Sequence, residues 1–266
     1  MIIEIFGPPG AGKTTFAQAL KARMRERGHL MELRLSQRPT ENVYGRAPIG
    51  SYQNVMIQRL TRPLLETLTI ARQPFANSRD LKTAIHLVRL LAPTSTLSSI
   101  KEMQYLFRLS HWWHDKSRTA RVTLFDQGFV QAVCTLALRA GVTNDKLIGD
   151  ALDYAPKSDL LIRLDAPLEL LEARLHDRER LQSAIERRLE PDLRLGLAFI
   201  PMIDRVQSLL LQRGRYMLSG SSVDRRALDK SVKVIEKEVT KMLQNRTQVS
   251  FVKTLATTAV SSYGKQ

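Results

Sequence analysis

The fold of this chain is decided by the stretch Gly7-Pro8-Pro9-Gly10-Ala11-Gly12-Lys13-Thr14, which matches the phosphate-binding pattern G-x-x-x-x-G-K-T. Met1–Phe6 before it is apolar and β-branched, which is typical of a strand, and Thr15–Arg27 after it is rich in helix formers. A strand, this loop and then a helix form the arrangement in which the pattern binds a polyphosphate. The alternative is a glycine-rich turn without a ligand, and the flanking strand and helix argue against it.

Each part of the loop has a chemical task. The glycines let backbone N–H groups point inward around phosphates, and the helix that follows adds the partial positive charge of its N-terminus. We expect Lys13 to reach the β- and γ-phosphates of a nucleotide and the Thr14 hydroxyl to hold Mg²⁺. The predicted nucleotide-binding residues are therefore Gly7 through Thr14, together with Thr15.

The composition is that of a globular α/β protein. The 266 residues suit one large domain or one domain with insertions, and 43% of them are hydrophobic. No apolar run approaches the ~20 residues that span a bilayer. The first residues already form the predicted strand, so we expect no signal peptide and a cytoplasmic location. The single cysteine, Cys134, excludes an internal disulfide and fits a reducing compartment, where we expect it to be a small buried hydrophobe.

The chain is strongly basic. Its 41 Lys and Arg residues against 26 Asp and Glu residues give a formal net charge of +15. Such a charge attracts anions, which include nucleotides, phosphorylated substrates, acidic membrane surfaces and nucleic acid. A solvated basic surface that aids solubility is the alternative, and charge balance alone does not choose between the two.

Predicted strands and helices alternate along the chain. The strands are Ile2–Phe6, Leu30–Leu35, Arg121–Phe125, Asp159–Leu164 and Arg215–Leu218, the last followed by a turn at Ser219–Ser222. The helices are Lys13–Arg27, Phe129–Arg139, one after Pro167 to about His176, about Leu193–Gln212 and about Arg225–Leu243, with a proline-broken helical region at about Tyr52–Lys116. This alternation predicts a parallel sheet with helices on both faces and a site at the carboxyl ends of its strands.

A second candidate site lies at the end of the third predicted strand. Val122–Phe125 is apolar and runs directly into Asp126. Beside a phosphate loop, such an Asp can bind Mg²⁺ through water or accept a proton from a substrate hydroxyl. Alone, an Asp after an apolar run commonly starts a turn. Paired with the loop, Asp126 is a predicted catalytic residue and, with Thr14, a predicted Mg²⁺ ligand.

Arginines gather after the fourth predicted strand. Arg174 and Arg178 are four residues apart and share one face of a predicted helix. Such arginines can close over a triphosphate and stabilise the charge on a transferred phosphoryl group. A solvated helix with i,i+4 charge pairs is the alternative. The position after the fourth strand of a phosphate-loop protein favours a catalytic role for both arginines.

These residues resemble the motifs of P-loop nucleoside and nucleotide kinases, thymidylate kinase-like proteins in particular. The similarity runs through about Met1–Leu243, and the loop is its most specific part. Asp126 matches the Asp of the family's Asp-Arg pair, and Gln127 stands where that arginine would be. Arg174 and Arg178 fall where the lid arginines of the family begin.

The resemblance implies a three-layer α/β fold with a five-stranded parallel sheet in the order 2-3-1-4-5, a helical insertion and a lid. Residues 1–244 would form the kinase domain, with a helical substrate-side region at about 52–118 and the lid at about 174–190. Residues 245–266 would be a C-terminal tail, either mobile or docked. The phosphoryl donor would be ATP with Mg²⁺.

The resemblance also implies where the two substrates bind. The Ser219–Ser222 turn would lie near the adenine of ATP, with Ser219 and Gly220 as binding residues. Arg38, Arg108 and Gln127 would contact the acceptor, a small molecule and most simply a nucleoside or nucleotide. The basic surface leaves nucleic acid open as a partner, and a homodimer is also left open.

Two rival functions fit part of the sequence. A regulatory or motor-type NTPase would carry a water-activating glutamate directly after Asp126, where Gln127 stands instead. A kinase acting on nucleic acid or another large anionic acceptor is suggested by the charge of +15 and would bind with a steep salt dependence. His111 and His114 are two histidines without a third ligand, which is weak evidence for zinc.

Overall fold

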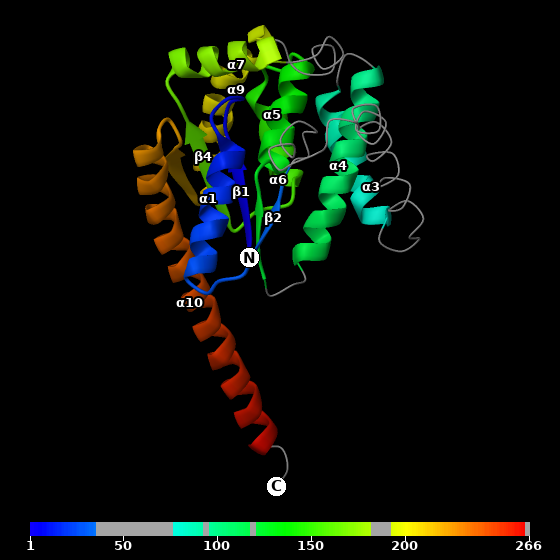
Figure 1. The fold of residues 1–266 in the computed structure, drawn as a ribbon. Helices are drawn as coiled ribbons and strands as arrows, with labels where there is room; N and C mark the ends of the chain where they lie inside the picture. Colours follow the sequence, from blue (N-terminus) through cyan, green and yellow to red (C-terminus); the bar gives the residue numbers. More distant parts are fainter. Residues whose placement is uncertain (36–76, 93–95, 118–120, 182–192, 264–266) are drawn as a thin grey trace, which may run out of the picture.

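The computed structural model of the chain describes residues 1–35, 77–92, 96–117, 121–181 and 193–263 (Figure 1). Five strands form one parallel sheet in the order β2-β3-β1-β4-β5, which confirms the predicted topology. The strands are β1 (Ile2–Phe6), β2 (Met31–Arg34), β3 (Val122–Phe125), β4 (Leu160–Asp165) and β5 (Met217–Ser221). The carboxyl ends of β1 and β3 therefore lie side by side.

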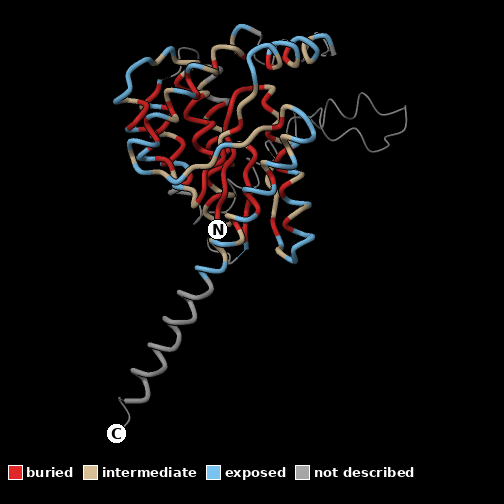
Figure 2. Tube along the Cα trace, turned by 90° about the vertical axis from the view of Figure 1, so that its left-hand side faces the viewer, coloured by how far each residue is buried: buried red, intermediate tan, exposed pale blue. Residues whose placement is uncertain are grey.

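The helices cover both faces of the sheet and make three layers. They are α1 (Lys13–Glu26), α3 (Asn77–Leu91), α4 (Thr96–Ser117), α5 (Phe129–Arg139), α6 (Asp145–Tyr154), α7 (Leu168–Leu181), α9 (Leu193–Gln212) and α10 (Arg225–Tyr263). On one face, α1 and α10 pack over Ile3 and Ile5. On the other, Phe6 and Phe125 pack beneath α5, α9 and the α3–α4 pair. Figure 2 shows the buried residues gathered inside these layers.

One helix was not predicted, and two predicted helix ends are wrong. Helix α6 was not predicted, and its signal is Asn144, whose side-chain oxygen accepts hydrogen bonds from the backbone N–H groups of Lys146 and Leu147. Helix α7 runs on to Leu181, past its predicted end at about His176. Helix α10 does not end near Leu243, since the backbone stays helical through Tyr263 and continues beyond the sheet in Figure 1.

Strand β5 is displaced from its predicted place. It runs from Met217 to Ser221, so Ser219 and Gly220 belong to the strand and not to a turn. A Cβ atom at Gly220 would lie 2.9 Å from Leu164 Cδ2 and 3.4 Å from Phe16 Cε2. This glycine therefore reflects close packing against the core, which is why it misled the sequence interpretation.

The division of the chain at residue 244 into a domain and a tail stays a prediction. Of the predicted substrate-side region, residues 52–76, 93–95 and 118 lie outside the described residues, as do residues 182–190 of the predicted lid. None of the described helices is long and apolar enough to cross a membrane.

Candidate nucleotide-binding site

The phosphate loop connects β1 to α1 in a conformation that requires its glycines. Gly7, Gly10 and Gly12 have φ values of 152°, 84° and 82°. A Cβ atom at Gly7 would lie 2.3 Å from the carbonyl oxygen of Leu164, and one at Gly12 would lie 2.2 Å from Ser222 Oγ. Only glycine fits these two positions, because any side chain would collide with atoms that close the loop from β4 and from the end of β5.

Helix α1 begins with Lys13 and Thr14, directly after Gly12 of this loop. The Lys13 side chain is 8% exposed, and its Nζ donates hydrogen bonds to the carbonyl oxygens of Gly7 at 2.7 Å and Pro8 at 2.9 Å. A buried ammonium group is thus held directly beneath the loop that would surround a polyphosphate. The sequence assigned Lys13 to the β- and γ-phosphates of a nucleotide, and that role stays a prediction.

Thr14 and Asp126 come together although they are far apart in the sequence. The Thr14 Oγ1 hydroxyl donates a hydrogen bond of 3.0 Å to Asp126 Oδ2. The Asp126 side chain is fully buried at the carboxyl end of β3, and its backbone N–H bonds to the carbonyl oxygen of Arg34 at the end of β2. A hydroxyl and a carboxylate at one place form the hard oxygen set that suits Mg²⁺. The structure therefore brings together the two residues predicted as its ligands.

Arg174 reaches the phosphate loop from α7. Its guanidinium group donates to the carbonyl oxygens of Gly10, Ser222 and Val223 at 2.8, 3.1 and 3.0 Å. These contacts tie the loop to the turn after β5, and they differ from the predicted position over a triphosphate. Arg178 lies one turn further along α7 and is half-buried.

Ser222 closes the loop from the other side, whereas the sequence predicted it only as the last residue of a turn near the adenine. Its buried hydroxyl donates a short hydrogen bond to the carbonyl oxygen of Ala11. The predicted adenine-side residues were Ser219 and Gly220, which the structure places in β5. The contact to the phosphate loop therefore comes from a residue just beyond the predicted pair.

We predict that Arg174→Ala lowers the free energy of unfolding by about 2 to 3 kcal/mol, because charge-assisted bonds to partly buried carbonyl groups are lost. Chemical denaturation of the variant measures this loss, and Arg180→Ala, at an exposed position on the same helix, is the matched control. Equal stability of the Arg174 and Arg180 variants would show that the three bonds do not hold the loop.

The predicted acceptor side is only partly described. Arg38 lies outside the described residues. Arg108 on α4 and Arg34 on β2 flank the Trp112 ring, with their Cζ atoms 5.9 and 5.7 Å from its centroid. The backbone carbonyl of Gln127 accepts a hydrogen bond of 3.3 Å from the Tyr105 hydroxyl. Arginine and aromatic side chains thus lie beside the end of β3.

A buried glutamate lies beneath the site. Glu4 in β1 is fully buried, and its Oε1 accepts hydrogen bonds from the N–H groups of Val130 at 2.6 Å and Gln131 at 3.4 Å, at the start of α5. Gly128 leaves room for it, since a Cβ atom there would lie 2.5 Å from the Glu4 carboxyl carbon. Burial raises the pKa of Glu4 from 4.5 to about 7, although the N–H of Val130 and the charge of Arg215 oppose the shift.

This pKa predicts how stability depends on pH. Because the pKa of Glu4 is raised on folding from 4.5 to about 7, its stabilising contribution is complete below pH 4.5 and is lost as the pH rises through 7. The loss is on the order of 3 kcal/mol. Urea unfolding of the wild type and of Glu4→Gln, followed from pH 4.5 to 8, measures the difference. Parallel pH profiles of the two proteins would contradict the raised pKa.

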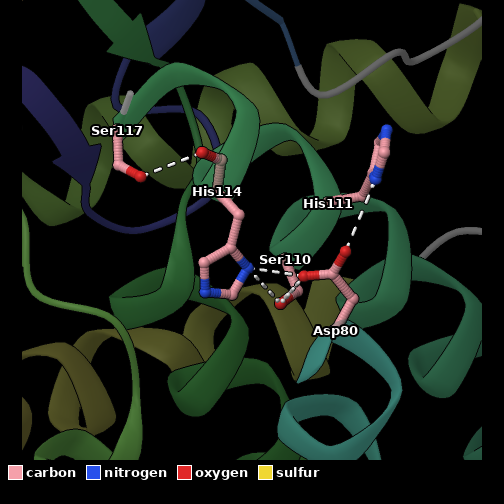
Figure 3. Close-up of polar contacts among 5 residues, drawn as sticks. All are labelled: Asp80, Ser110, His111, His114 and Ser117. Atoms are coloured by element: carbon pink, nitrogen blue, oxygen red, sulfur yellow. Dashed lines mark hydrogen bonds and ion pairs between the residues drawn. The ribbon is translucent and has the colours of Figure 1, made fainter. Parts of the chain in front are cut away.

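The two histidines considered for zinc instead bind a buried carboxylate (Figure 3). Asp80 on α3 is 2% exposed, and its carboxylate oxygens lie 2.5 Å from His114 Nδ1 and 3.4 Å from His111 Nδ1 on α4. The Ser110 hydroxyl also donates to Asp80, at 2.9 Å. Within the described residues, no cluster of three or more His, Cys, Asp or Glu residues could hold a metal ion. These contacts join α3 to α4.

Comparisons with known proteins give little beyond the overall shape. No family model matches the chain, and no curated protein does. Among solved structures, the chain is similar to a deoxyadenosine kinase from M. mycoides, solved with the products dCMP and a flexible dCDP bound. The TM-score is 0.46 at 12% sequence identity, and the alignment covers 91% of this chain and 100% of that chain. At this level the likeness assigns neither activity nor substrate to this chain.

Proposed function

We propose that this chain is an ATP-dependent phosphotransferase that moves the γ-phosphate of ATP to a small-molecule acceptor, a nucleoside or nucleotide. The observation that carries the proposal is the hydrogen bond between Thr14 and Asp126 at the mouth of the phosphate loop. It joins the end of the donor-binding loop to a buried carboxylate on the neighbouring strand. Phosphoryl transfer needs this combination of positioning and charge neutralisation and little covalent chemistry from the protein.

Each residue at the site has a proposed role on the donor side. The backbone of Gly7–Thr15 would surround the phosphates, and Lys13 would leave its two carbonyl partners to neutralise them. Thr14 and Asp126 would hold Mg²⁺, which supplies charge neutralisation at the phosphate oxygens when bound. Arg178, one turn beyond the arginine that ties down the loop, would approach the transferred group.

On the acceptor side, Asp126 would also accept the proton of the acceptor hydroxyl. Arg108, which lies beside the Trp112 ring, and Gln127, whose backbone carbonyl bonds to Tyr105, would contact the acceptor. Gln127 follows Asp126 directly, where a motor-type NTPase would carry a water-activating glutamate. This order favours transfer to a bound acceptor over hydrolysis.

Two measurements test the proposal. ATP should bind more tightly with Mg²⁺ than without it in a calorimetric titration. Incubation with γ-labelled ATP and a panel of nucleosides, nucleotides, sugars and nucleic-acid ends should then label a nucleoside or nucleotide. Labelling of nucleic-acid ends only, with an affinity that falls steeply with salt, would replace the proposed acceptor by a large one. Absence of ATP binding would remove the proposal.

A further inference from the structure

We propose that Gln131 is a positioning residue that holds the start of the phosphate loop in its nucleotide-binding conformation. The Gln131 side chain on α5 is 5% exposed, and its Oε1 accepts a hydrogen bond of 3.1 Å from the backbone N–H of Gly7. Gly7 is the first residue of the loop, and a Cβ atom there would lie 2.3 Å from the carbonyl oxygen of Leu164. The inference rests on the proposed function, because it concerns how that loop receives ATP.

Gly7 is held at both of its polar groups. Its N–H donates to Gln131, and its carbonyl oxygen accepts from Lys13 Nζ at 2.7 Å. In the proposed function, Lys13 turns from this carbonyl to the phosphates when ATP binds. The bond to Gln131 does not involve Lys13, so it can persist and keep Gly7 in place while Lys13 changes partners. An N–H group buried without an acceptor is costly, which is why the loss of this bond should disturb the loop.

The position of Gln131 is itself fixed by the strand that precedes the loop. Glu4 in β1 accepts hydrogen bonds from the N–H groups of Val130 and Gln131, so it sets the start of α5 against the sheet. The backbone N–H of Gln131 thus bonds to Glu4 in the sheet, and its side chain bonds to Gly7 in the loop. Hydrogen bonds through Gln131 therefore link the strand before the loop to the first residue of the loop. Asp126 lies at the end of β3, only a few residues before α5. The same helix start therefore positions both the loop and the segment that carries Asp126.

The test uses Gln131→Met, which keeps the length of the side chain and removes the acceptor. The dissociation constant for ATP should rise about tenfold, because a buried donor is left without a partner. Amide hydrogen exchange of Gly7, followed by NMR in the ligand-free protein, should become at least about tenfold faster. The matched control is Thr135→Val, one turn further along α5, where the lost hydroxyl donates to the Gln131 carbonyl within the helix.

An ATP dissociation constant within twofold of wild type, with Gly7 still protected, would overturn the inference. If Gln131→Met does not fold, Gln131→Glu replaces it, because a carboxylate keeps an acceptor at the same place. The Glu variant should retain protection of the Gly7 amide without ligand, and loss of that protection would equally overturn the inference. If the wild-type protein binds no ATP, the proposed function and the inference both fail. If the wild type binds ATP and the Gln131→Met variant binds it equally well, the inference alone fails.

Discussion

Lys13→Ala is expected to reduce phosphoryl transfer by about a thousandfold or more, because the ammonium group beneath the loop is the proposed counter-charge for the β- and γ-phosphates. Its present partners are two backbone carbonyls of the loop, Gly7 and Pro8. Arg174 also contacts the loop, but through the carbonyl oxygen of Gly10. Steady-state transfer of label from ATP, at saturating acceptor, measures the effect.

A control variant distinguishes the loss of the Lys13 charge from a loss of folding. Lys21→Ala removes a lysine from an exposed position on the same helix and should leave the rate within twofold of wild type. Thermal unfolding of both variants shows whether the loss of the two carbonyl contacts loosens the loop. Transfer at the wild-type rate by the Lys13 variant would refute the assignment of this loop to the donor phosphates.

Asp126→Asn is expected to lower turnover by about a hundredfold to a thousandfold, with an ATP dissociation constant changed less than about threefold. The amide is nearly the same size as the carboxylate, and its oxygen can still accept the Thr14 hydroxyl bond. It removes the charge that would hold Mg²⁺ and the base that would take the acceptor proton. Single-turnover kinetics over a range of Mg²⁺ concentrations separate these two roles, since a weakened metal site recovers at high Mg²⁺ and a missing base does not.

Asp150→Asn, at an exposed position on α6, is the matched control for this change and should leave turnover unaltered. Unchanged turnover in the Asp126 variant would remove Asp126 from catalysis. The hydrogen bond to Thr14 would then be a structural contact alone.

The part of the site that could be predicted is the part whose residues lie close together in the sequence. The loop, the strand before it and the helix after it are contiguous, so the spacing of Gly7, Gly12 and Lys13 is enough to place them. Asp126 follows a short apolar strand, and the parallel sheet then brings its end next to the loop. Helix α5 was predicted with its observed bounds, because Gly128 and Gly141 punctuate an apolar run.

The contacts that hold the loop could not be predicted from one sequence. Ser222 and Gln131 bond to the backbone at Ala11 and Gly7, across 211 and 124 positions of the chain. The residues next to Ser222 and Gln131 in the sequence give no indication of such distant partners. Glu4 interrupts the apolar pattern of β1, and that interruption is a signal that sequence reasoning passed over. Arg174 was predicted to lie over a triphosphate, and its observed carbonyl partners depend on tertiary packing that one sequence does not show.

The most direct test of the account is the fate of the γ-phosphate. Wild-type protein with γ-labelled ATP, Mg²⁺ and a mixture of nucleosides and nucleoside monophosphates should place most of the released label on one of these acceptors. The labelled product should vanish with Lys13→Ala. Release of the label only as inorganic phosphate, unaffected by any acceptor, would contradict the account and make the protein a hydrolytic NTPase.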